Sequence, residues 1–326
     1  PLILARDPQL MRLLNINARI PNPRAPQSRT DPVGGARFIN RAYKIIDARY
    51  KIIERDVKAL FLSIPVQANN ADGATFTYDF SSRRYTQLSD QLQRILDQML
   101  LEGFEYNELW SGELVREAYQ SGTALANANL ANMSDTYAAA RPLAAVLYSE
   151  PYMRRVGIAY AKSYSDWKAL SEKARADLAN VISEQIAMGA NPKAATPVIM
   201  KRIEVSRSYA KQLAQTEITG VLRESRWQER DEAQTLLGLE IGLLWTSALL
   251  PTTRFTHASR HLGIFTSDNC REFYSKNGNR YRCHCAQTEV LYLNGKPQIT
   301  DKLENSYKKE RADWVSQYKQ KEEALA

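Results

Sequence analysis

The sequence predicts a mainly helical protein: a helical bundle followed by a small, loop-rich α+β module that contains the cysteines and histidines. Two observations predict this class. Apolar residues recur at three- and four-residue spacing through most of 36–234, as in amphipathic helices. From residue 238 short apolar runs alternate with glycine, asparagine and serine, which favours strands and loops. We therefore divide the chain into an arm (1–35), a helical domain (36–186), a module (187–298) and a charged C-terminal helix (299–326).

The first 35 residues are typical of an extended basic arm. Six of the thirteen prolines fall here, and because proline fixes φ and removes a donor, a long helix is excluded. Residues 1–63 contain 12 Lys/Arg and 5 Asp/Glu, which is +7 of the net charge of +8. The excess of positive charge indicates one of two arrangements: a helix face exposed to solvent, or an arm that lies near phosphate or an acidic partner. The candidate partner-binding residues are Arg6, Arg12, Arg19, Arg24 and Arg29.

Helical periodicity begins after the arm. The first predicted helix covers 36–63 and ends before Pro65, and residues 75–80 alternate polar and aromatic as a short strand or hairpin does. Thr86, Ser165 and Ser206 are the expected N-caps of later helices. Those helices are predicted over 86–102, 108–133, 135–147 with an interruption at Pro142, 165–186, 193–203 and 207–234, with 152–165 as a short helix or a strand.

The C-terminal third has a different pattern. Residues 239–247 predict a buried strand, and 290–293 predict a second one closed by an Asn-Gly turn. The rest of 248–298 is expected to be irregular. Residues 301–325 predict a charged helix with a thin apolar stripe.

The three cysteines and three histidines all lie between His257 and Cys285. Zinc prefers thiolate and imidazole ligands, usually four in a tetrahedron. The candidate ligands of one structural zinc ion are His257, Cys270, Cys283 and Cys285, with His261 as a substitute for His257. If 283–285 is extended, His284 points away from its two neighbours. The alternative is a hydrogen-bonded loop core in which the cysteines are small buried apolar residues.

The sequence lacks common catalytic motifs. The sequence has no phosphate loop, no Gly-x-Ser-x-Gly and no His-Glu-x-x-His, and Glu217 is better explained as part of a polar helix face than as an acid or base. No stretch approaches the ~20 apolar residues of a membrane span, so no membrane partner is expected. We expect the protein not to be an enzyme.

An ordered series of short motifs in 187–290 carries a resemblance. They read Gly189-Ala-Asn-Pro192, Gln215-Thr216-Glu217, Trp245-Thr246-Ser247, Arg254-Phe-Thr-His257, Gly263-Ile-Phe265 and Cys283-His-Cys285. This order resembles the phage head morphogenesis family, the Mu F-like minor capsid proteins. The chain departs from the family at three places. The family usually has an acidic residue where Leu249-Leu250-Pro251 stands, usually has arginine in place of Gln215, and often has arginine in place of His284.

The resemblance implies a minor capsid protein of a tailed bacteriophage. Such a protein would be in the virion, inside the capsid at the portal vertex, after assembly in the host cytoplasm. Its implied partners are the portal protein, possible contacts to the major capsid protein, and packaged double-stranded DNA bound nonspecifically during head assembly and DNA ejection. Two alternatives stay open: a metal-dependent hydrolase or toxin-like enzyme delivered with the phage DNA, and a free DNA-binding protein of the host cell.

Overall fold

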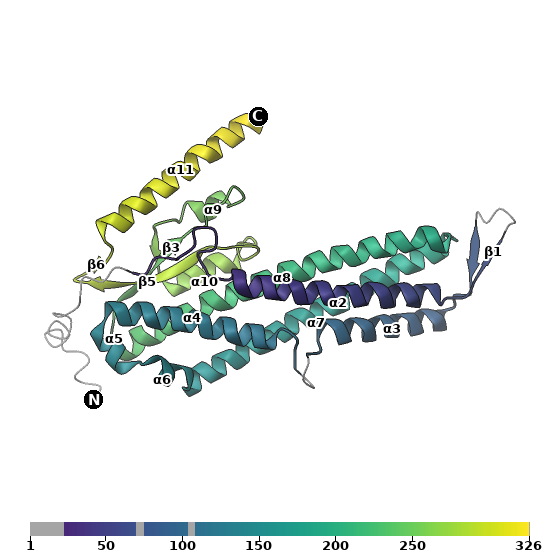
Figure 1. Ribbon diagram of the computed structural model, residues 1–326, viewed down its shortest axis with the longest axis horizontal. Coiled ribbons are helices and arrows are strands. Elements are labelled where there is room, and N and C mark those ends of the chain that lie inside the picture. Colours follow the sequence, from purple (N-terminus) through teal and green to yellow (C-terminus); the bar gives the residue numbers. More distant parts are fainter. Residues whose placement is uncertain (1–22, 70–74, 104–107, 326) are drawn as a thin grey trace. The chain divides into compact units, whose positions relative to one another are not determined.

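The computed structural model describes residues 23–69, 75–103 and 108–325, and it confirms a mainly helical protein with a small C-terminal antiparallel sheet (Figure 1). The helices are α2 (Ala36–Leu62), α3 (Ser82–Leu100), α4 (Gly112–Met133), α5 (Asp135–Ala140), α6 (Leu143–Leu147), α7 (Glu150–Ala187), α8 (Pro192–Leu237), α9 (Phe255–Ala258), α10 (Ser267–Ser275) and α11 (Asp301–Leu325). The strands are β1 (Val66–Ala68), β2 (Phe76–Tyr78), β3 (Ile241–Thr246), β4 (Ile264–Phe265), β5 (Ala286–Leu293) and β6 (Lys296–Pro297).

The chain forms two compact units, and each draws on separate stretches of sequence. Unit 1 comprises 1–38, 116–157 and 215–326, and unit 2 comprises 39–115 and 158–214. The four segments predicted from the sequence, with boundaries at 35, 186 and 298, stay a prediction.

Unit 2 is a helical assembly with one hairpin. Apolar residues on α2 and α3 that recur at helical spacing are buried, including Tyr50 and Leu96. Trp110 and Trp167 pack edge to face with ring centroids 4.8 Å apart. Strands β1 and β2 pair antiparallel, so the predicted strand at 75–80 is one half of a hairpin.

Unit 1 contains the sheet, whose strand order is β4-β3-β5-β6. Strand β3 is buried along its whole length, and it pairs antiparallel with β5 from Ile241 opposite Leu291 to Thr246 opposite Ala286. Helix α11 covers part of this sheet: Tyr307 packs in a cluster with Leu244 and Val290. The apolar stripe predicted for this helix therefore packs against the sheet of the same chain.

Buried ion pairs attach α8 to other elements of unit 1. Arg226 binds the carboxylate of Glu289 through two hydrogen bonds of 2.9 and 2.6 Å, and Asn129 donates to the same carboxylate at 2.9 Å. Arg141 binds Glu229 in a similar way, at 2.8 and 2.9 Å. Because both carboxylate oxygens of Glu289 accept hydrogen bonds, these bonds offset the free-energy cost of burying its charge.

Several helix boundaries differ from the prediction. Helix α3 begins at Ser82, where Ser81 accepts a hydrogen bond from the Arg84 amide, so Thr86 is not the cap. Helices α7 and α8 run without a break through the predicted caps Ser165 and Ser206. The hydroxyl of Ser206 pairs instead with that of Tyr50 at 2.8 Å, a tertiary contact that a local capping rule does not anticipate.

The stretch 248–298 is more regular than expected. It contains α9 and α10, and Thr266 caps α10 by accepting a hydrogen bond from the Asn269 amide at 3.1 Å. Strand β5 begins four residues before the predicted start at 290. Among the described residues, no helix combines the length and apolar character that crossing a membrane requires.

Candidate metal centre

Three of the predicted ligands meet in unit 1. The ligand atoms of His257, Cys283 and Cys285 all lie within 4.8 Å of one another, and the three side chains are buried. Nδ1 of His257 lies 3.4 Å from Sγ of Cys283 and 3.6 Å from Sγ of Cys285. The other ring nitrogen, Nε2, is buried and has no hydrogen-bond partner in the described part of the chain.

Local structure explains why these side chains converge. Cys283 and Cys285 precede β5 in an extended segment, where alternate side chains point the same way. His257 is in α9, whose backbone is held to the end of β3: Ser247 donates from its hydroxyl to the His257 carbonyl at 2.5 Å. The Trp245 indole in turn donates to that hydroxyl at 3.1 Å.

Aromatic rings enclose the centre. The Phe273 ring stands edge to face against His257 with centroids 4.9 Å apart. Trp245 contacts His257, Phe265, Phe273 and Tyr274, with centroid distances of 5.1 to 6.3 Å. These rings exclude water from the thiols and strengthen electrostatic interactions among them.

The spacing of the three ligand atoms fits a tetrahedral metal ion. Zinc lies about 2.3 Å from sulfur and about 2.0 Å from nitrogen, so a tetrahedron places the nitrogen about 3.5 Å from each sulfur. The observed separations of 3.4 and 3.6 Å match this value. The same separations also fit thiol–imidazole hydrogen bonds, which are the second predicted arrangement.

The two cysteines differ in protonation. Burial raises the pKa of the Cys283 thiol, but hydrogen bonds from Cys285 and His257 together with the charge of Arg223 hold the pKa well below its usual value. The hydrogen bond to Cys283 and burial raise the pKa of Cys285 well above the usual value. The pair therefore favours one thiolate, the form of cysteine that binds metals.

Arg223 supplies the nearest positive charge, and sequence reasoning missed it. This arginine of α8 is buried and donates to the carbonyls of Cys283 and Cys285 at 3.3 and 3.4 Å. Its guanidinium lies 4.2 Å from the centroid of the Tyr274 ring. The only sequence signal was its position among the apolar residues of a helix, where a charged residue usually faces solvent.

The remaining predicted ligands have other roles. Cys270 does not join the group. It is fully buried in the apolar cluster around Trp245, where burial raises its pKa to about 12 and disfavours the thiolate. His261 accepts a hydrogen bond from the Ser247 amide at its Nδ1, 3.0 Å away, and burial lowers its pKa to about 4.

His284 points away from the centre, as its place between the two cysteines predicts. Its Nε2 lies 2.9 Å from Nε2 of Gln215, and its Nδ1 lies 3.7 Å from a carboxylate oxygen of Asp31. Gln215 and His284, two of the positions at which the chain departs from the resembled family, contact each other. The segment 283–285 thus contacts α8 and the residues before α2 on one side and the centre on the other.

The candidate arm residues have varied positions. Arg6, Arg12 and Arg19 lie outside the described residues. The backbone amide of Arg24 donates to Asn129 at 2.8 Å, and the exposed guanidinium of Arg29 pairs with Glu310 at 2.8 Å. Arg29 is therefore partly occupied by a contact within the chain.

Comparison with known proteins gave no match to a protein-family model, to a curated protein or to a solved structure.

Proposed function

We propose that the chain is a minor, structural component of a tailed-phage head, and that a zinc ion held by His257, Cys283 and Cys285 stabilises its C-terminal module. One observation carries the proposal: residues from separate motifs of the resembled family pack around one buried core. The Trp245 ring contacts both His257 and Phe265, and Cys283 and Cys285 belong to the same apolar cluster. Residues far apart in the sequence thereby form one unit, as a shared module requires.

The proposed role of zinc is to hold three segments together. His257 belongs to α9, the two cysteines precede β5, and Arg223 of α8 contacts the carbonyls of both cysteines. A region with a short sheet has little apolar core of its own, so metal binding adds directly to its folding free energy. The three side chains are almost fully buried, and a structural zinc ion would take a fourth ligand besides them, because structural zinc sites are four-coordinate.

The proposed partners are the portal protein and the packaged DNA. Basic residues near the N-terminus supply the charge for nonspecific phosphate contact, and Arg29 is exposed despite its pairing with Glu310. Such contact weakens with salt, by a slope in log K of about −0.9 for each phosphate neutralised. Contact with portal through aromatic side chains would depend little on salt.

The test is virion incorporation together with capture of purified portal. We expect the wild-type chain in purified particles and in a complex with portal on gel filtration. A variant with both Cys283→Ser and Cys285→Ser is expected to lose the metal and to be depleted from particles. Cys270→Ala is the matched control, because it removes a buried thiol that is outside the ligand group, and it should retain the metal.

Two results would overturn the proposal. One is the absence of the wild-type chain from purified particles. The other is a double cysteine variant that folds and is incorporated normally but no longer turns over a substrate, since that pattern indicates a catalytic metal.

A further inference from the structure

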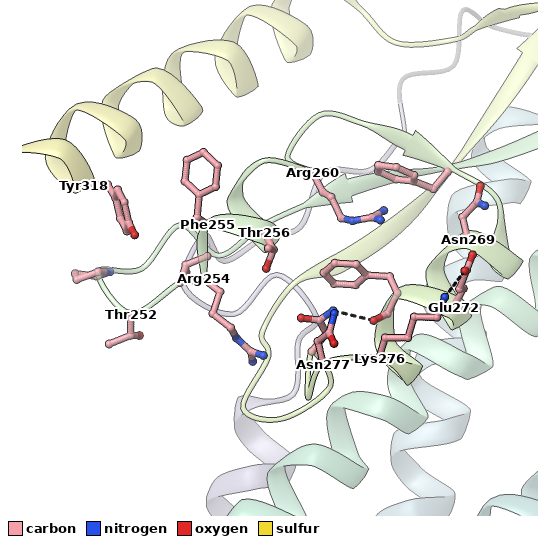
Figure 2. A pocket seen from close by; sticks show the side chains of 15 residues that line it. Thr252, Arg254, Phe255, Thr256, Arg260, Asn269, Glu272, Lys276, Asn277 and Tyr318 are labelled. Atoms are coloured by element: carbon pink, nitrogen blue, oxygen red, sulfur yellow. Dashed lines mark hydrogen bonds and ion pairs between the residues drawn. The ribbon is translucent and has the colours of Figure 1, made fainter. Parts of the chain in front are cut away.

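A cavity of about 970 Å³ opens in unit 1 next to the metal centre, and Figure 2 shows the side chains around it. It is lined by the loop after β3 and by parts of α9, α10 and α11. Phe273 lines the cavity and also contacts His257, so the cavity and the centre share this ring. The volume lies within the range of about 300–1,000 Å³ typical of ligand sites.

Arg260 forms no hydrogen bond or ion pair with a carboxylate in the described part of the chain. Its guanidinium lies 4.1 Å from the Phe273 centroid and 4.5 Å from the Phe265 centroid. Its Nη1 is buried and has no hydrogen-bond partner among the described residues. The rings fix the guanidinium in place, and an arginine so oriented is suited to bind phosphate or carboxylate.

The cavity lining contains one carboxylate, and its neighbours Lys276 and, to a smaller extent, Arg260 lower its pKa. Glu272 is the carboxylate in the lining, and it pairs with Lys276 at 2.6 Å. Arg254 donates to the carbonyl oxygens of Gly278 and Tyr281. Three cations therefore face one carboxylate, and the lining has a net positive charge.

The cavity also has an exposed aromatic wall. Phe255 is 54% exposed, and its ring centroid lies 5.9 Å from that of Tyr318. Trp314 stacks on Tyr318 behind it, with centroids 4.9 Å apart and planes 24° from parallel. An exposed ring that neighbouring rings hold in place offers a surface on which a flat group can stack.

We propose that this cavity binds single-stranded nucleic acid, with a phosphate at Arg260 and a base against Phe255. Sites for single strands combine basic groups with exposed aromatic rings in this way. An acidic peptide would use the cations but would leave the rings without a partner. Bases in a duplex stack on each other and do not reach the wall. This inference is independent of the proposed virion role, which concerns double-stranded DNA and portal.

The test is fluorescence anisotropy of the full-length chain with a labelled oligothymidine, a duplex of equal charge and a polyglutamate peptide. We expect the oligothymidine to bind more tightly than the other two. Phe255→Ala should weaken its binding by about 5- to 150-fold, which is the contribution of one stacked base. Arg260→Gln should weaken binding and reduce the salt slope by about 0.7, the value for one single-strand phosphate.

Matched variants on α3 control for the loss of a charge or of a ring. Arg83→Gln and Tyr85→Ala change exposed residues of unit 2 and should leave binding unchanged. Circular dichroism and the melting temperature establish that each variant is folded, and the exposed Phe255 can be changed without opening a core. The proposal is overturned if folded Phe255→Ala binds oligothymidine as the wild type does, or if the duplex or the peptide binds equally well.

Discussion

Replacing Glu289 by alanine is expected to destabilise the folded chain by about 3–5 kcal/mol, the cost of breaking one side of a buried ion pair. The side chain of Glu289 is fully buried and that of Arg226 is only 9% exposed. The substitution removes two hydrogen bonds from Arg226 and one from Asn129, and it leaves the guanidinium without a counter-charge. Each such bond to a charged group contributes about 1.5–3 kcal/mol, so the effect cannot be small.

The measurement is urea unfolding monitored by tryptophan fluorescence. Glu272→Ala is the control, because the Glu272–Lys276 pair is 61% exposed on both sides and should change the free energy of unfolding little. The combined change Arg226→Met and Glu289→Leu should recover most of the loss, since it removes both charges and keeps the volume. A loss below about 1 kcal/mol in Glu289→Ala would refute the role of this pair in attaching α8 to β5.

Two further predictions concern packing and pH. Gly122→Ala should destabilise the folded chain by more than about 1 kcal/mol, because an added Cβ would lie 2.5 Å from the Leu222 carbonyl oxygen. Gly220→Ala, whose added Cβ would have no atom within 4 Å, should stabilise the folded chain by up to about 1 kcal/mol. Thermal melts of both variants measure these effects. Equal effects of the two changes would contradict the close approach of α4 to α8. Burial lowers the pKa of His261 from 6.5 to about 4 in the folded chain. As the pH drops below 6.5, the unfolded chain therefore takes up the proton before the folded chain does. The free energy of unfolding then falls between pH 6.5 and pH 4. Wild type should therefore lose up to about 3 kcal/mol more than His261→Gln over this range, and parallel pH profiles of the two proteins would contradict the buried neutral histidine.

The helical class and most of the centre could be predicted from the sequence because both depend on local periodicity. The two-residue period of 283–285 indicated that Cys283 and Cys285 share a face, and this was confirmed. The choice of Cys270 as a ligand depended on residue type alone. A buried cysteine satisfies an apolar cluster equally well, and the sequence has no signal that separates the two roles.

What the sequence could not predict depends on contacts between distant residues. Ser206 is of a residue type that often caps helices. Its hydroxyl instead pairs with the hydroxyl of Tyr50, which is distant in the sequence, and the helix continues past it. Arg223 and Arg226 look like ordinary charges on a helix, yet both are buried because the Cys283 and Cys285 carbonyls and the Glu289 carboxylate are placed opposite them. Such pairs become visible only when β5 is placed against α8.

The central claim is that His257, Cys283 and Cys285 hold a metal ion that stabilises the module. Native mass spectrometry of the purified full-length chain, with metal analysis, tests it most directly. We expect one zinc ion per chain, lost with the double change Cys283→Ser and Cys285→Ser and kept in Cys270→Ala. A wild-type chain that is fully folded with no bound metal, and whose melting temperature does not change when zinc or a chelator is added, would contradict the claim and favour the hydrogen-bonded core.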